Sequence, residues 1–130
     1  MTTTDSKGIE AIGQIAVVVK DVDRATRFYQ DVLGLKLLFR FPGLAFFDCG
    51  GVRLMLSRPE RPEFDQNSII YYRVADIGEA ASHLEAHGVV FDGEPHVVHR
   101  DQRHELWMAF FRDSEGNYLG LMHEKPLPPS

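Results

Sequence analysis

The chain has 130 residues, of which 44% are hydrophobic, and this suits one compact domain with a substantial core. Its formal net charge of −5 argues against a nucleic-acid or anionic-membrane surface, because such surfaces need a basic face. Cys49 is the single cysteine, which excludes an internal disulfide and favours a reducing, cytoplasmic location. Residues Met1–Gly8 lack the apolar segment of a signal peptide, and no apolar run approaches the roughly 20 residues of a membrane-spanning helix.

The first half of the chain predicts the element order β-α-β-β-β. In residues 14–19 the odd-numbered and the even-numbered side chains are both mostly apolar, which predicts a strand that is covered on both faces. Asp21 then suits a helix N-cap, an apolar helical stripe follows from Val22 to Val32, and Gly34 ends the helix. Three further strands are predicted at Leu35–Phe41, Leu44–Cys49 and Val52–Ser57, with glycine-containing turns between them.

The second half repeats this order after a polar linker at residues 58–67. A strand is predicted at Ser68–Val74, and a helix follows that Asp76 caps and Gly88 ends. The last three strands are predicted at Val89–Phe91 together with Pro95–Val98, at Glu105–Arg112 and at Tyr118–Glu124. A turn at residues 113–117 joins the last two strands.

Two stretches of the sequence repeat each other. Val19-Lys20-Asp21-Val22 aligns with Val74-Ala75-Asp76-Ile77, and each half then reaches a Phe-Phe pair, a glycine and an apolar strand. Such a repeat indicates two similar modules, here about 11–57 and 68–124. We therefore predict an α+β fold in which two β-α-β-β-β modules form one curved mixed sheet, with the helices on its outer face, within a single domain over residues 1–130.

The alternation of side chains along a strand predicts which residues face the hollow of this sheet. The phase of Glu105–Arg112 stays ambiguous because both of its faces are apolar, and Trp107 is expected to form an apolar wall. A mostly apolar hollow with a few polar anchors is typical of a small-molecule site. The residues expected to bind a ligand there are Gln14, Arg53, Met55, Tyr71, Arg73, His96, Trp107, Tyr118 and Met122.

Arg53 and Arg73 lie mid-strand on the predicted hollow face, where an unpaired guanidinium is costly to bury. One interpretation is structural: the arginines form an ion pair, for example with Asp48 or another acid, or extend to the rim of the hollow. The other is that they bind a ligand carboxylate or phosphate, and both interpretations stay open. The second interpretation favours an anionic ligand. Tyr71 and Tyr118 either donate hydroxyl hydrogen bonds or fill space.

Three histidines, His96, His99 and His104, lie within nine positions of one another. They indicate either a metal or general-base site with Glu105 nearby, or a solvated polar hairpin, and we favour the hairpin. Of the three, we rank His96 first for facing the hollow, because it follows Pro95 just inside a strand.

Three segments resemble the glyoxalase / bleomycin-resistance / extradiol dioxygenase superfamily, also called vicinal oxygen chelate proteins. They are Gln14–Asp23, Phe28–Leu35 and Phe111–Leu121, and the resemblance covers nearly the whole chain. It implies a glyoxalase-like fold and paired modules in a homodimer, which also suits the open edges of a module's sheet.

The resemblance further implies a divalent metal held by one ligand from each of four strands, at positions that map to Gln14, Met55, Ile69 and Gly120. Met55 offers a soft thioether, and Ile69 and Gly120 have no donor side chain. Because a divalent site needs about three or more protein ligands, we expect the usual metal site to be missing.

Two functions follow from this pattern. We favour a protein that binds a small organic molecule in the hollow without metal or other cofactor, like the drug-sequestering resistance members of the superfamily. The alternative is a metal-dependent lyase, isomerase or dioxygenase with an altered ligand set that includes Gln14 and His96.

Overall fold

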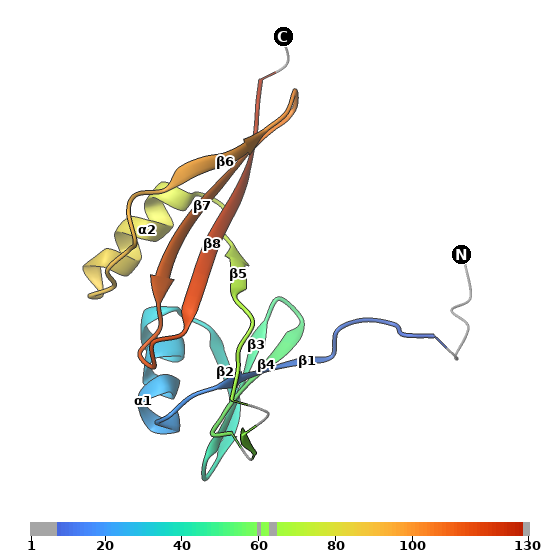
Figure 1. Cartoon of the computed structure of the whole chain (residues 1–130), viewed down its shortest axis with the longest axis vertical. Helices are drawn as coiled ribbons and strands as arrows, with labels where there is room; N and C mark the ends of the chain where they lie inside the picture. Colours follow the sequence, from blue (N-terminus) through green and yellow to red (C-terminus); the bar gives the residue numbers. More distant parts are fainter. Residues whose placement is uncertain (1–7, 60, 63–64, 129–130) are drawn as a thin grey trace.

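The computed structural model describes residues 8–59, 61–62 and 65–128 (Figure 1). Two expectations fall partly outside these residues. They concern the N-terminal segment, of which only Gly8 is described, and the predicted linker, of which residues 60, 63 and 64 are not described. Within it, none of the helices is long and apolar enough to cross a membrane.

The predicted β-α-β-β-β order is confirmed in both halves. The first module contains β1 (Gln14–Val18), α1 (Val22–Arg27), η1 (Phe28–Val32), β2 (Lys36–Phe41), β3 (Leu44–Cys49) and β4 (Val52–Ser57). The second contains β5 (Ile70–Arg73), α2 (Ile77–Ala86), β6 (His96–Arg100), β7 (His104–Arg112) and β8 (Tyr118–Pro126). The predicted strand segment at Val89–Phe91 is wrong, because only an isolated bridge from Phe91 to Phe111 forms there.

The aspartates predicted as helix caps occupy that position in both modules. Asp21 Oδ1 accepts a hydrogen bond from the Arg24 amide at 3.0 Å, and Asp76 Oδ1 accepts one from the Glu79 amide at 3.0 Å. The helical segment of the first module ends before Gly34, whose φ of 75° lies in the left-handed region that favours glycine.

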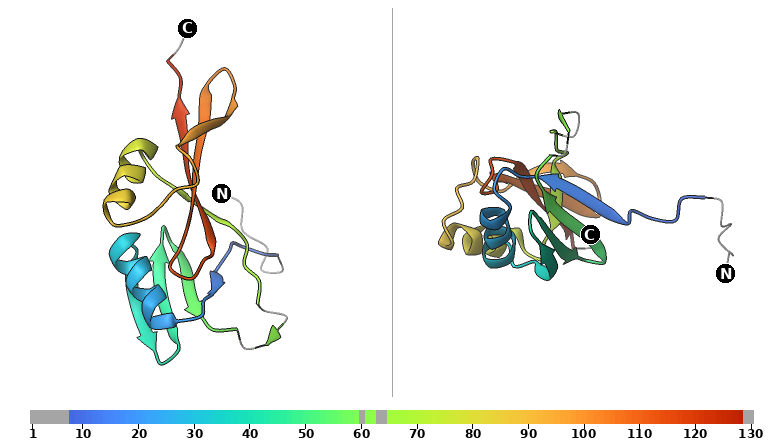
Figure 2. Two further views of the ribbon diagram at one scale, coloured as in Figure 1. Left: turned by 60° about the vertical axis from the view of Figure 1, so that its left-hand side comes forward. Right: turned by 90° about the horizontal axis from the view of Figure 1, so that it is seen from below.

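The eight strands form two four-stranded mixed sheets rather than one continuous sheet. In each module the first strand pairs in parallel with the fourth, which gives the orders β1-β4-β3-β2 and β5-β8-β7-β6. Helices α1 and α2 lie on the same side of the molecule, and the uncovered faces of the sheets lie on the other (Figures 1 and 2). Each sheet therefore has one face that packs against a helix and one face that is uncovered.

The core lies between each sheet and its helix. Leu54, Leu56, Leu119 and Leu121 are buried on the helix-covered face, as the alternation along β4 and β8 predicts. The largest fully buried side chains are Tyr29, Phe47, Phe111, Leu56, Leu119, Val19 and Thr26.

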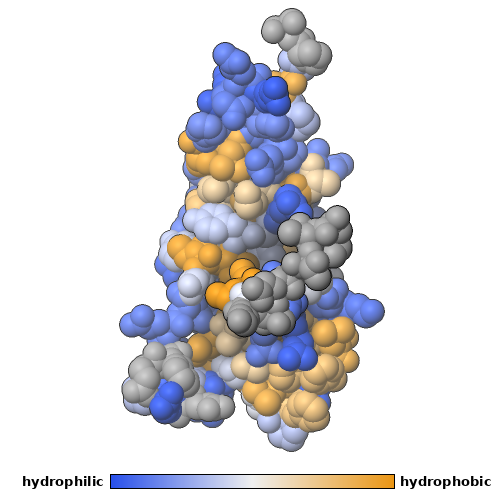
Figure 3. Space-filling view, turned by 90° about the vertical axis from the view of Figure 1, so that its right-hand side faces the viewer, coloured by the Kyte–Doolittle hydropathy of each residue, from blue (hydrophilic) through white to orange (hydrophobic). Residues whose placement is uncertain are grey.

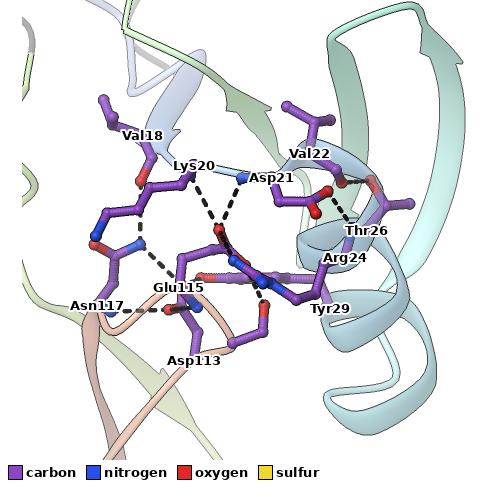
Figure 4. Close-up of polar contacts among 11 residues, drawn as sticks. Val18, Lys20, Asp21, Val22, Arg24, Thr26, Tyr29, Asp113, Glu115 and Asn117 are labelled. Atoms are coloured by element: carbon purple, nitrogen blue, oxygen red, sulfur yellow. Dashed lines mark hydrogen bonds and ion pairs between the residues drawn. The ribbon is translucent and has the colours of Figure 1, made fainter.

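The turn between β7 and β8 joins the second module to the first (Figure 4). The Glu115 carboxylate accepts hydrogen bonds from the backbone amides of Lys20 at 3.1 Å and Asp21 at 2.8 Å, at the start of α1. It also accepts from Arg24 Nε at 2.7 Å and Arg24 Nη2 at 3.0 Å, and its side chain is only 1% exposed. These hydrogen bonds, above all those from Arg24, lower the pKa of Glu115 to about 2.

Two further residues of the same turn hold the modules together. Asp113 Oδ2 accepts a hydrogen bond from the hydroxyl of Tyr29 at 2.7 Å, and both residues are buried. Burial, together with the charge of Asp113, raises the pKa of Tyr29, so this tyrosine stays a hydrogen-bond donor. Asn117 Nδ2 donates to the Val18 carbonyl at 3.1 Å. The turn thus supplies hydrogen-bond partners to polar groups of β1, α1 and η1 in the first module.

The Glu115 contacts predict that Glu115→Gln lowers the free energy of unfolding at pH 7 by about 1.5–3 kcal/mol, because hydrogen bonds to a charged group are lost. Urea unfolding at one fixed protein concentration measures this change. The matched control is Glu85→Gln on α2, an exposed residue, which should change the stability by less than about 0.5 kcal/mol.

The same contacts predict an acid-sensitive contribution to stability. The folded pKa of Glu115, about 2, lies below the ordinary value of 4.5, so its contribution is fully present above pH 4.5 and is lost as the pH falls towards 2. The stability difference between the wild type and Glu115→Gln should therefore shrink in unfolding curves recorded between pH 5 and pH 2. A difference that stays constant over that range would contradict this assignment.

Candidate functional site: the uncovered sheet faces

The strand register shows which residues share the uncovered face of the first sheet, here called the hollow face. Gln14 lies beside Arg53 across β1 and β4, and Met55 lies beside Phe46 across β4 and β3. Arg53 and Met55 alternate with the buried residue Leu54, so they point away from the helix. The predicted orientation of Gln14, Arg53 and Met55 is therefore confirmed, whereas their role in binding stays a prediction.

The hollow face of the second sheet likewise contains the predicted residues of β5, β6 and β8. Tyr71 is the register partner of Gly120, and Arg73 is the partner of Met122. From Met122 the same row continues to Met108 of β7 and then to His96 of β6. Tyr118 lies two residues before Gly120 and so shares this face.

Trp107 does not face the hollow, and the expectation that it forms a wall there is wrong. It is the register partner of His123 and Val97, and it alternates with Met108, which lies on the hollow face. Its side chain packs against the core, and its Nε1 donates to Glu105 Oε1 at 3.1 Å. Because both faces of β7 are apolar, the alternation in the sequence could not decide this orientation.

A polar cluster surrounds Arg53 on the hollow face of the first sheet. Arg53 Nε donates to Gln14 Oε1 at 2.8 Å, and its guanidinium lies 5.3 Å from the ring centroid of Phe46. Gln14 Nε2 in turn points at Met55 Sδ, 3.7 Å away. Among the described residues no ion pair to Arg53 forms, so Asp48, its register partner, is not its counter-ion. The guanidinium therefore keeps an uncompensated positive charge at an exposed position.

The sequence interpretation missed Phe46, which holds this guanidinium by a cation–π contact. In the sequence, Phe46 contributes only to the Phe-Phe pair that indicates the internal repeat. The glycine turn at Gly50-Gly51 carried a usable signal, because a hairpin of this length aligns Phe46 with Met55 and so places both on one face.

The four positions at which metal ligands are implied do not fit a divalent ion. The Gln14 carbonyl oxygen, the atom that would bind a metal, already accepts from Arg53, and the positive guanidinium opposes a second cation. Met55 and Ile69 supply a thioether and a hydrocarbon. Over the described ranges, no group of three or more His, Cys, Asp or Glu side chains is placed to hold a metal ion.

The fourth of these positions, Gly120, is covered by an aromatic ring. A Cβ atom at Gly120 would lie 2.8 Å from Cδ2 of Tyr71 and 3.3 Å from Cε1 of Phe110. The two rings pack edge to face, with centroids 5.7 Å apart. A longer, metal-binding side chain at this position would have to displace Tyr71.

The late histidines do not converge on one point. His96 is exposed, and its Nδ1 lies 3.1 Å from the carbonyl oxygen of Glu94. His99 lies 3.8 Å from Asp101 in the exposed hairpin, whereas His123 Nδ1 accepts from the Ile77 amide at 3.3 Å on the helix side. Gln14 and His96 belong to different sheets, and no hydrogen bond joins them within the described part of the chain.

The hollow faces are open to solvent in the single chain. Tyr71 is 42% exposed and Phe41 is 55% exposed. Figure 3 shows hydrophobic areas on this side of the molecule, with polar areas between them. Apolar surface bordered by polar residues is typical of a binding or association surface.

Tyr118, on the hollow face of the second sheet, already contacts two other side chains. Its hydroxyl donates to Asp92, and the guanidinium of Arg112 lies 4.0 Å from the centroid of its ring. The hydrogen bond to Asp92 raises the pKa of Tyr118, so its hydroxyl stays protonated. Of the two tyrosines predicted as donors, Tyr71 is the one whose hydroxyl makes no hydrogen bond within the described residues.

Several solved structures share this fold. A lactoylglutathione lyase from Agrobacterium tumefaciens is 24% identical with a TM-score of 0.73, over 89% of this chain and 95% of that one. TnmS3, an antibiotic binding protein from Streptomyces sp. CB03234, is 25% identical with a TM-score of 0.72, over 90% and 98% of the two chains. A glyoxalase/bleomycin resistance protein/dioxygenase from Alicyclobacillus acidocaldarius is 20% identical with a TM-score of 0.69, over 88% and 91%.

The glyoxalase-like α+β fold predicted from the sequence is therefore confirmed. The model of the family described as Glyoxalase/Bleomycin resistance protein/Dioxygenase superfamily matches residues 11–121, which is most of the chain. The protein belongs to the glyoxalase / bleomycin resistance protein / dioxygenase superfamily.

Proposed function

We propose that the protein binds a small organic anion on the hollow face and does so without a divalent metal. The observation that carries this proposal is the hydrogen bond from Arg53 to Gln14, at 2.8 Å. It puts a fixed positive charge beside the atom where a metal ligand is implied. A ligand carboxylate or phosphate can then bind to this guanidinium rather than to a metal ion.

Arg73 places a second cation on the uncovered face of the second sheet, and no hydrogen bond or ion pair holds it among the described residues. Apolar and aromatic side chains on these two faces would contact the body of the ligand, with Met55 and Phe46 in the first sheet and Tyr71 in the second. The similarity to TnmS3, whose description is an antibiotic binding protein, supports the binding of a small molecule.

The same proposal includes a homodimer in the cytoplasm. The hollow faces are too exposed to bury most of a small ligand, so another surface must close the site. β1 and β5 each stand at an edge of their sheet, and unpaired strand edges favour association. A second copy of the chain would cover both the edges and the apolar surface.

The alternative function, a metal-dependent lyase, isomerase or dioxygenase, needs Gln14 and His96 in one coordination sphere. Its support is membership of the superfamily. Against it stand the engagement of Gln14 by Arg53 and the separate sheets of the two residues.

The first prediction from this proposal concerns metal content. Protein that is purified without chelator, incubated with Ni, Zn, Fe or Mn salts and dialysed should retain far less than one ion per chain in elemental analysis. Stoichiometric retention that Gln14→Ala abolishes would instead support the metal-dependent alternative.

The second prediction concerns anion binding. Benzoate and phenyl phosphate should raise the unfolding midpoint in a thermal-shift assay, and Arg53→Ala should weaken their affinity by about tenfold to a hundredfold, as loss of a charged hydrogen bond does. Arg27→Ala, an exposed arginine on the helix side, is the matched control and should leave the affinity unchanged. An equal shift in wild type and Arg53→Ala would remove Arg53 from the site.

The third prediction concerns the packing of the Tyr71 ring over Gly120. Gly120→Ala places a Cβ within 2.8 Å of the Tyr71 ring, so it should destabilise the fold by roughly 1–3 kcal/mol in urea unfolding. Gly13→Ala is the control, because its added Cβ meets no atom within 4 Å. An unchanged stability for Gly120→Ala would show that Tyr71 does not rest on this glycine.

A further inference from the structure

A cavity of about 420 Å³ lies between the two modules, on the helix side of the second sheet. Leu33 and Leu35, which follow η1, line it from the first module, and Ala80 and Leu84 of α2 line it from the second. Leu121 of β8 closes its base on the face opposite to the hollow face, since it alternates with Gly120 and Met122. A mostly apolar cavity of this volume between two modules has the size and setting of a small-molecule site.

Tyr72, which lines this cavity, has a hydroxyl that makes no hydrogen bond among the described residues. The hydroxyl of Tyr72 is closed to solvent and has no hydrogen-bond partner in the described structure. Buried hydroxyls almost always have a partner, because an unpaired one costs about 1–3 kcal/mol. Cys49 also lines the cavity, and burial raises the pKa of both side chains, so both stay neutral.

The charged residues of the cavity give it no preference for an anion. Glu79 and His83 of α2 line a mainly apolar interior, and the side chain of Arg73 lies on the opposite face of β5, since it alternates with Tyr72. This differs from the hollow face, where the guanidinium of Arg53 has no counter-ion among the described residues. The two surfaces therefore suit ligands of different charge.

We propose that this cavity is a second ligand site, which takes a small neutral molecule with an apolar body and one carbonyl oxygen that accepts a hydrogen bond from Tyr72. Because the hydroxyl is closed to water, its engagement requires the side chain of Tyr72 or Cys49 to turn when the ligand enters. The site is separate from the proposed function on the hollow face, and each can fail without the other.

The single cysteine of the chain provides a reporter inside the cavity. Acetophenone has the required apolar ring and carbonyl, and ethylbenzene has nearly the same shape without the acceptor. Acetophenone should slow the alkylation of Cys49 by iodoacetamide saturably, and the apparent affinity should exceed that of ethylbenzene by roughly threefold to tenfold, as one neutral hydrogen bond provides.

Two variants test the site itself. Tyr72→Phe keeps the ring and removes the hydroxyl, so it should bind both probes equally. Ala80→Leu fills the cavity from α2 and should abolish protection by both, whereas Ala86→Leu, exposed on the same helix, should not. Arg53→Ala should leave acetophenone binding unchanged, which separates this site from the hollow face.

Three results would overturn the proposal. The first is the absence of saturable protection up to the solubility limit of acetophenone. The second is a preference for acetophenone that survives in Tyr72→Phe. The third is protection of Cys49 that rises with protein concentration without any probe, because a second copy of the chain would then cover the cavity.

Discussion

The arrangement of the molecule depends on the buried carboxylates of the turn between β7 and β8. Glu115 and Asp113 come from the second module, and besides donors within their own turn they accept hydrogen bonds from the first module: from two backbone amides, Arg24 and the hydroxyl of Tyr29. Buried charges are tolerated only when their hydrogen-bonding capacity is satisfied, so this joint fixes the modules in one position. Both the open hollow faces and the cavity between the modules follow from that position.

The hollow face of the first sheet shows how a fold can keep its architecture while its electrostatics change. An amide oxygen that could bind a metal ion accepts a hydrogen bond from a guanidinium instead. The positive charge at that place belongs to a side chain fixed to β4 and is spread over a planar group. Such a group recognises anions by direction as well as by charge, and it needs no other protein ligands to stay in place.

The two proposed ligand surfaces arise from one property of strands, the alternation of side chains. Tyr71 lies on the open face with Gly120 beneath it, whereas Tyr72, the next residue, points into the space between the modules. The two tyrosines therefore meet different environments, one half-open and one closed to water. A single strand, β5, thus contributes to the proposed anion site and to the proposed neutral site on opposite sides of the sheet.

The sequence by itself determined the features that depend on neighbouring residues. Asp21 and Asp76 as caps, the element order in each half, and the orientation of Arg53 and Tyr71 follow from local patterns and the internal repeat, and the structure agrees with them. Tertiary structure alone decided the orientation of Trp107, because an apolar strand carries no alternation that distinguishes its faces. It also decided the division into two sheets, the pairing of Tyr29 with Asp113 and the ring of Tyr71 over Gly120, since these join residues far apart in the chain whose packing no local pattern specifies.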